Sequence, residues 1–198
     1  ERTCEGAVAL IHQEDLAQAM SLDWQNTDVK FQEPEWPGDP RRASVQRIAE
    51  VIGSIPDSTA AIEQWIRQLT YHVAIGNNDA HAKNVALVHS AEGTALSQVY
   101  DAVPNLFQEG LISWNLALSK DGIFDHRKLS VDRLLREIAS WSLVPGARAE
   151  ELVSETLSNA DEALRAVAAP KGVSPGMVER LEWNVTRLLS GAEISAPK

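Results

Sequence analysis

Gly76-Asn77-Asn78-Asp79-Ala80-His81-Ala82-Lys83-Asn84 is the most informative stretch of this chain, together with the Asp101 that follows it. An Asp and an Asn five residues apart can share one loop, with the carboxylate beside an acceptor hydroxyl and the amide oxygen beside a metal ion. A second Asp, returned to the loop by a short hairpin, can hold Mg²⁺ under the phosphates of a nucleotide. Asp79, Asn84 and Asp101 therefore point to phosphoryl transfer.

The segments before this loop are predicted to be mainly helical. Residues 12–21 are expected to form a short helix, and the proline-rich residues 23–41 an irregular loop or an extended arm. Apolar side chains at helical spacing predict one helix over 45–55 and another from residue 58 to a stop at Gly76. The second helix leads directly into the Asn-rich stretch.

Short β runs are predicted after the loop. Val85–His89 and Ala95–Val99 flank a turn and are expected to form a hairpin, which would bring Asp101 back beside Asn84. Ile112–Leu118 is expected to be extended and is followed by a turn at residues 120–122.

Three helices are predicted to close the chain. The first covers 130–141 and the second 146–168. The third is expected to start with Ser174 as N-cap and Pro175 at its first position, and to stop at Gly191. The predicted fold class is mainly α.

Composition limits the classes of partner and location. The chain has 198 residues and a net charge of −10, without a basic stripe, so direct binding to nucleic acid is not expected. Its lone cysteine excludes a disulfide framework and a cysteine-based zinc site, which favours a reducing cytoplasm. No apolar run of membrane-spanning length and no signal peptide is visible.

Each candidate residue also has a plainer interpretation. Asn-Asn-Asp is an ordinary turn composition, because these side chains hydrogen-bond their own backbone. Lys83 is a candidate for neutralising phosphate charge, although spacing alone favours a solvated lysine. His81 is a candidate for holding the loop, with a structural role favoured over that of a base. His72, His81 and His89 with Asp79 suggest a metal hydrolase, but their spacing differs from the known helical zinc motif.

The Asn-rich loop and Tyr100-Asp101-Ala102-Val103 resemble the signature of HipA-type serine/threonine kinases, the toxins of toxin–antitoxin pairs. Residues 11–19 and 117–119 resemble further segments of the same family. The resemblance implies a kinase-like C-terminal lobe, with Asp79 as the catalytic residue and Asn84 and Asp101 as Mg²⁺ ligands. It also implies ATP as substrate, a protein serine or threonine as acceptor, and a HipB-like DNA-binding antitoxin as partner.

The chain departs from that family in two respects. None of its 11 glycines forms a G-x-G-x-x-G or Walker-type phosphate loop, and it shows no lysine on an N-terminal strand that pairs with a helix Glu. It is therefore expected to correspond to the C-terminal lobe alone. Residues 1–198 are expected to be one such lobe, with a helical part at 8–76, the loop, hairpin and following loop at 77–128, and C-terminal helices at 129–198. The alternative is a non-catalytic module that binds an antitoxin or another protein.

Overall fold

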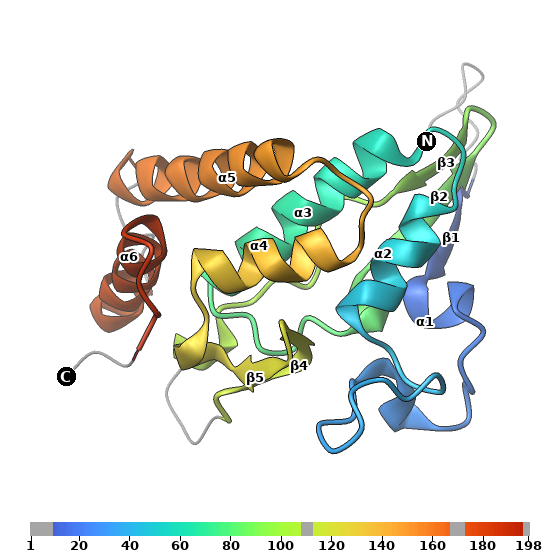
Figure 1. Cartoon of the computed structure of the whole chain (residues 1–198), viewed down its shortest axis with the longest axis horizontal. Helices are drawn as coiled ribbons and strands as arrows, with labels where there is room; N and C mark the ends of the chain where they lie inside the picture. Colours follow the sequence, from blue (N-terminus) through green and yellow to red (C-terminus); the bar gives the residue numbers. More distant parts are fainter. Residues whose placement is uncertain (1–9, 108–112, 167–172, 196–198) are drawn as a thin grey trace.

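The computed structural model describes residues 10–107, 113–166 and 173–195, and helices are the larger part of its secondary structure (Figure 1). The α-helices are α1 (Leu16–Ala19), α2 (Val45–Gly53), α3 (Ser58–Ala74), α4 (Val131–Ser140), α5 (Gly146–Ala166) and α6 (Pro175–Leu189). Short 3-10 turns are η1 (Thr27–Lys30), η2 (Ala82–Asn84), η3 (Asn105–Phe107) and η4 (His126–Lys128).

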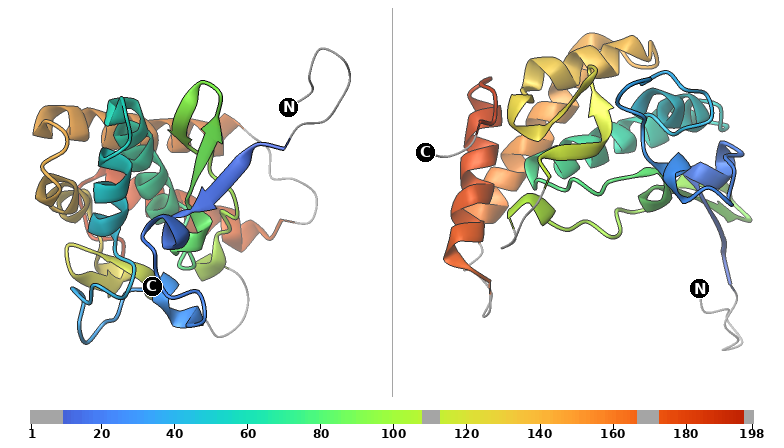
Figure 2. Two further views of the ribbon diagram at one scale, coloured as in Figure 1. Left: turned by 90° about the vertical axis from the view of Figure 1, so that its right-hand side faces the viewer. Right: turned by 90° about the horizontal axis from the view of Figure 1, so that it is seen from below.

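Two small antiparallel sheets accompany the helices. The first has the order β1-β2-β3, formed by β1 (His12–Asp15), β2 (Ala86–Ser90) and β3 (Gly93–Leu96). The second pairs β4 (Asn115–Lys120) with β5 (Ile123–Asp125). The three-stranded sheet lies at the end of the molecule opposite α6 (Figures 1 and 2).

Helix α3 is the central element of the core and packs against α2, α5 and α6. Its predicted apolar face is buried and consists of Ile62, Ile66, Leu69 and Val73. Burying a side chain of this size stabilises the fold by about 1.5–3 kcal/mol. The long neighbours of α3 therefore fix the direction in which it delivers the chain to the Asn-rich loop, residues 76–84.

The predicted C-terminal helices are confirmed within the described residues. Ser174 occupies the N-cap position of α6 and Pro175 follows at its start. Gly191 has a φ of +72°, the left-handed conformation that ends helices, directly after the C-cap. Residues 167 and 168, at the end of the predicted second helix, lie outside the described residues.

The predicted helix over 12–21 is wrong in its first half. His12–Asp15 forms β1, paired with β2, and only Leu16–Ala19 is helical. Asp15 ends the strand and begins the helix, because its side chain accepts a hydrogen bond from the Gln18 N–H in a capping box. The 8–76 segment is thus not wholly helical, since pairing with a distant strand supplies the backbone bonds of its first residues.

The predicted strand boundaries also shift. The second strand of the hairpin begins at Gly93 and ends at Leu96, so the turn is tighter than predicted and residues 97–99 are not strand. The extended segment predicted over 112–118 is confirmed as β4 from Asn115 onward, and the strand runs to Lys120. Ile112 itself lies outside the described residues.

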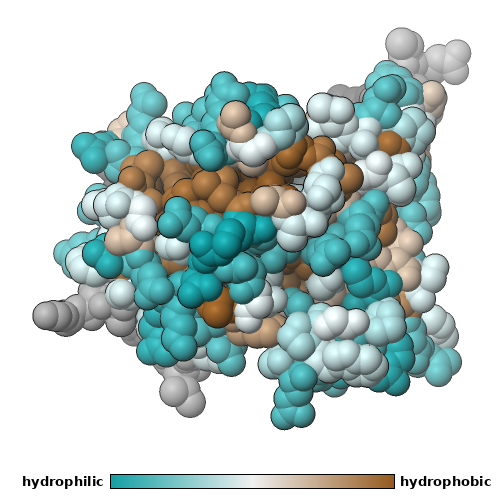
Figure 3. Space-filling model, viewed as in Figure 1, coloured by the Kyte–Doolittle hydropathy of each residue, from teal (hydrophilic) through white to brown (hydrophobic). Residues whose placement is uncertain are grey.

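The surface combines polar ridges with apolar strips. Apolar side chains are visible along the space between α5 and α4 (Figure 3). No helix among the described residues is long and apolar enough to cross a membrane.

Candidate functional site

Gly76 turns the chain from α3 into the Asn-rich loop. Its φ is +67°, and a Cβ at this position would lie 2.7 Å from the ring of Phe107. Glycine alone adopts this conformation without strain and leaves room for the ring. The predicted helix stop at Gly76 is therefore confirmed, with a close packing contact as an additional reason.

Asn77 is buried and connects three segments at the base of the loop. Its Oδ1 accepts a hydrogen bond from the Asp79 N–H at 3.0 Å. Its Nδ2 lies 3.1 Å from Nδ1 of His72 and donates to the Asp101 carbonyl oxygen at 3.4 Å. Burial, followed by the charge of Lys120, lowers the pKa of His72 to about 4. The imidazole is therefore neutral at pH 7 and can accept from Asn77.

Asp79 and Asn84 are joined through the backbone. The Asp79 carbonyl accepts from the His81 N–H at 2.8 Å and from Nδ2 of Asn84 at 3.0 Å. The Asp79 side chain is 53% exposed, whereas Asn84 is buried. Because the amide nitrogen of Asn84 holds the loop, its Oδ1 is the atom left for a ligand.

Asp101 returns to this loop after the β2–β3 hairpin. The hydroxyl of Tyr100 donates to the Lys83 carbonyl at 2.7 Å, and Asp101 has a φ of +53°. This left-handed backbone is uncommon for a residue other than glycine and tends to persist where the surroundings hold it. The structure thus brings the backbones of Asp79, Asn84 and Asp101 together, while the Lys83 side chain is exposed.

Lys30 is a member of the site that the sequence did not indicate. Its Nζ lies 2.8 Å from Nε2 of His81, and that same nitrogen lies 3.9 Å from Oδ1 of Asp79. Burial lowers the pKa of His81 and Lys30 lowers it further, against the opposing effects of the Asp79 and Asp101 carboxylates. His81 therefore lies among one cation and two carboxylates.

The donor set fits a hard metal ion. Asp101 offers an exposed carboxylate and Asn84 a neutral amide oxygen, which are oxygen ligands of the kind that Mg²⁺ prefers. The described residues contain no cluster of three or more His, Cys, Asp or Glu side chains that could hold a metal by itself. A metal held by Asn84 and Asp101 would therefore complete its shell with phosphate or water oxygens, as Mg²⁺ does in nucleotide sites.

The metal-hydrolase interpretation of the histidines finds no support in the geometry. His72 contacts Asn77, whereas His89 lies 3.3 Å from Glu14 and stacks on His12. Each of the three candidate histidines therefore has a different partner, and they do not gather around one metal position.

A second polar layer lies behind the loop and closes the end of α3. Nε2 of His126 donates to the Val73 carbonyl at 2.8 Å, and Nδ2 of Asn184 donates to the Val73 and Ala74 carbonyls at 3.0 and 2.6 Å. Burial lowers the pKa of His126 to about 4 and that of the nearby Lys120 to about 8. These residues are far from the loop in sequence, and no local pattern identifies them.

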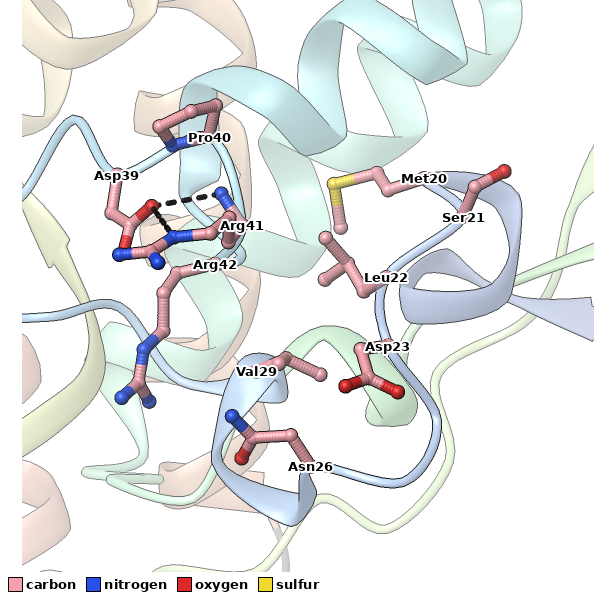
Figure 4. Close-up of a pocket in the computed structure, with 10 residues that line it drawn as sticks. All are labelled: Met20, Ser21, Leu22, Asp23, Asn26, Val29, Asp39, Pro40, Arg41 and Arg42. Carbon is pink, nitrogen blue, oxygen red and sulfur yellow. Dashed lines mark hydrogen bonds and ion pairs between the residues drawn. The ribbon is translucent and has the colours of Figure 1, made fainter.

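A surface hollow lies beside η1, the turn that carries Lys30 (Figure 4). Its volume is about 580 Å³, and its walls come from residues 20–23 and 39–42 together with Asn26 and Val29. The guanidinium of Arg41 is held by two hydrogen bonds to the Asp39 carboxylate, each 3.0 Å long. Asp79, Asn84 and Asp101 are not among its lining residues.

Comparison with known proteins identifies the family. The model of the HipA-like C-terminal domain matches residues 2–164. The chain belongs to the HipA-like C-terminal domain family. A curated relative from Sinorhizobium fredii, named "Putative kinase Y4dM", is 32% identical over 171 residues, which are 84% of this chain and 36% of that protein.

A solved structure shows the same fold for this HipA-like domain. HipA of Shewanella oneidensis MR-1, in a complex with HipB and operator DNA, superposes with a TM-score of 0.71 at 19% identity. The match covers 93% of this chain and 44% of that one. The HipA-like domain described here therefore spans less than half the length of both relatives.

Proposed function

We propose that this HipA-like domain is the catalytic C-terminal lobe of a serine/threonine protein kinase that transfers the γ-phosphate of ATP. The observation that carries the proposal is that the buried Asn77 bonds the backbones of both Asp79 and Asp101, while Asn84 bonds the Asp79 carbonyl. The kinase name of the Sinorhizobium relative supports the same activity.

The residues divide into an acceptor side and a metal side. Asp79 carries the exposed carboxylate, and in this proposal it orients the acceptor hydroxyl and takes its proton as the bond to phosphorus forms. Asn84 and Asp101 would hold Mg²⁺ through their side-chain oxygens. When bound, the metal supplies positive charge that neutralises the phosphates. Lys83 and His81 remain candidates for support of the phosphate or of the loop.

Substitution of Asp79 tests this proposal directly. In the protein encoded by the whole reading frame, Asp79→Asn is expected to lower γ-phosphate transfer by about 10²–10⁴-fold, because the general base is lost. Radiolabel transfer from ATP and mass spectrometry of phosphoserine and phosphothreonine provide the measurement. Asp132→Asn, at an exposed site on α4, is the matched control. Equal activity of Asp79→Asn and wild type would remove the role given to Asp79.

The whole protein would be the toxin of a toxin–antitoxin pair, acting in the cytoplasm on a protein substrate. Its antitoxin would be a HipB-like DNA-binding protein, because the Shewanella neighbour is part of a HipA, HipB and operator DNA complex. Co-expression followed by size-exclusion chromatography with the product of an adjacent reading frame tests the partnership. Failure of the two proteins to co-elute would count against it.

A second candidate function is protein binding without catalysis. A hollow of about 500 Å³ between α3, α5 and the segment after β3 exposes apolar side chains, including Tyr71 and Val99.

The chain also lacks a phosphate-binding glycine loop, so the isolated 198-residue chain is expected to bind Mg-ATP weakly or undetectably. Micromolar affinity by calorimetry would contradict that expectation. Phosphotransfer by the whole protein would exclude a purely non-catalytic role.

A further inference from the structure

Lys30 reaches the candidate site from a segment 51 residues away in sequence. Its ammonium hydrogen-bonds Nε2 of His81 at 2.8 Å. A lysine ammonium only donates hydrogen bonds, so Nε2 must be the accepting, unprotonated nitrogen of the ring. A neutral imidazole carries one proton, which therefore resides on Nδ1. Within the described part of the chain, Nδ1 is buried and has no partner.

The backbone around Lys30 is anchored on both sides. The Val29 carbonyl accepts from the Ala43 N–H at 2.8 Å. On the other side, the Gln32 N–H donates to the Ala117 carbonyl of β4 at 3.0 Å, and Oε1 of Gln32 accepts from the Ser119 N–H at 2.7 Å. The Lys30 side chain is therefore delivered by a fixed turn.

Phe31 encloses His81 from another direction. Its ring meets the imidazole edge-on, with centroids 5.4 Å apart, and the Lys30 ammonium lies 4.8 Å from the same ring. An aromatic face favours a nearby cation. The end of η1 thus sets both the orientation of His81 and the location of the positive charge.

The consequence for the site concerns Asp79. Oδ1 of Asp79 lies 3.9 Å from Nε2 of His81, but that nitrogen carries no proton and cannot donate to the carboxylate. The positive charge on this side of the site comes from Lys30. With its lone pair occupied by Lys30, Nε2 is also unable to take the acceptor proton, which leaves that task to Asp79.

We propose that Lys30 is a positioning residue that holds His81 as the Nδ1–H imidazole and supplies positive charge on the acceptor side of the phosphoryl-transfer site. The inference rests on the proposed kinase function. Negative charge gathers there from Asp79 and from the transferred phosphoryl group, so a fixed cation favours the transfer step more than nucleotide binding.

The first test is the tautomer of His81, measured by NMR on histidine-labelled protein from the whole reading frame and assigned with His81→Gln. Wild type is expected to show the Nδ1–H form. Lys30→Met is expected to give a mixture with the Nε2–H form, while Lys30→Arg, which keeps a donor and a charge, retains the wild-type signal. A wild-type Nε2–H form, or no change in Lys30→Met, would overturn the pairing.

The second test is kinetic. Lys30→Met is expected to lower kcat by about ten- to a hundredfold, with the KM for ATP changed less than about twofold and partial recovery in Lys30→Arg. Lys128→Met removes an exposed lysine on η4 and is the control. If Lys30→Met does not fold, Lys30→Gln takes its place. An unchanged kcat, or a change confined to KM, would overturn the role.

The two tests also separate this inference from the function on which it rests. A wild-type protein without phosphotransfer would refute the proposed function and the catalytic consequence of Lys30. The NMR spectrum would still decide whether Lys30 fixes the tautomer of His81.

Discussion

The helical core and the Asn-rich loop are held by different kinds of interaction. The buried packing between α3, α5 and α6 is mainly apolar, and Leu152, Leu157 and Leu188 are at most 1% exposed. The loop is instead held by directional bonds from Asn77 and from the backbone of Asp79. Apolar packing provides stability, whereas hydrogen bonds fix the positions of atoms within tenths of an ångström. Stability and site geometry should therefore respond to different substitutions.

Truncating a core leucine is expected to give the largest effect on stability. Leu152→Ala should lower the free energy of unfolding by about 2–5 kcal/mol, because it leaves a cavity in the helical core. Denaturant unfolding at 25 °C measures the loss, with Glu150→Ala on the exposed face of α5 as control. The folded fraction should keep its phosphotransfer rate. A large loss of rate in folded protein would break the separation between core and loop.

Low pH is expected to destabilise the fold through the two buried histidines that lie between the helical core and the loop. Unfolded histidines bind a proton near pH 6.5, whereas burial lowers the pKa of both His72 and His126 to about 4. Between pH 6.5 and 4 the unfolded state therefore binds more protons than the folded state. The free energy of unfolding keeps its full value above pH 6.5 and falls as the pH is lowered toward 4. Each histidine contributes up to about 3 kcal/mol of this loss.

The variant His126→Gln measures that contribution, because glutamine keeps a donor for the Val73 carbonyl but does not titrate. Unfolding free energies between pH 7 and 4 should fall less steeply than in wild type. His12→Gln, at an exposed position, should retain the wild-type slope. An unchanged slope in His126→Gln would show that the acid response arises elsewhere.

Removing the anchor of the loop is expected to lower both activity and stability. Asn77→Ala should cost about 1–3 kcal/mol of folding free energy, because it leaves buried groups without partners. Phosphotransfer should fall by about 10²-fold, since small displacements of reacting groups are costly. Asn78→Ala is the matched control, because the Asn78 side chain bonds the Ser113 carbonyl instead. Equal rates for the two variants would contradict the anchoring role of Asn77.

The sequence predicted those parts of the fold that depend on local spacing. Helix faces, the stop at Gly76 and the start at Ser174 were all recognisable because they depend on neighbouring residues. The strand at His12–Asp15 was missed because its pairing with β2 joins residues more than 70 positions apart. Its polar composition carries no strand signal of its own.

The same division applies to the candidate site. Asp79, Asn84 and Asp101 could be proposed because they share one loop and one hairpin. Lys30 and Asn184 could not, since each reaches the loop region only through tertiary packing. A lysine in a polar, proline-rich segment looks like many solvated lysines until the fold places it against His81.

Asn184 has a consequence for comparing HipA-like domains. It lies on α6, beyond residues 2–164 that match the family, yet its amide holds the last two carbonyls of α3 just before the loop. The segment that matches the family model therefore does not contain every residue that supports the loop in this chain. The terminal helix is therefore a distant element that helps to hold the last turn of α3, and with it the start of the loop.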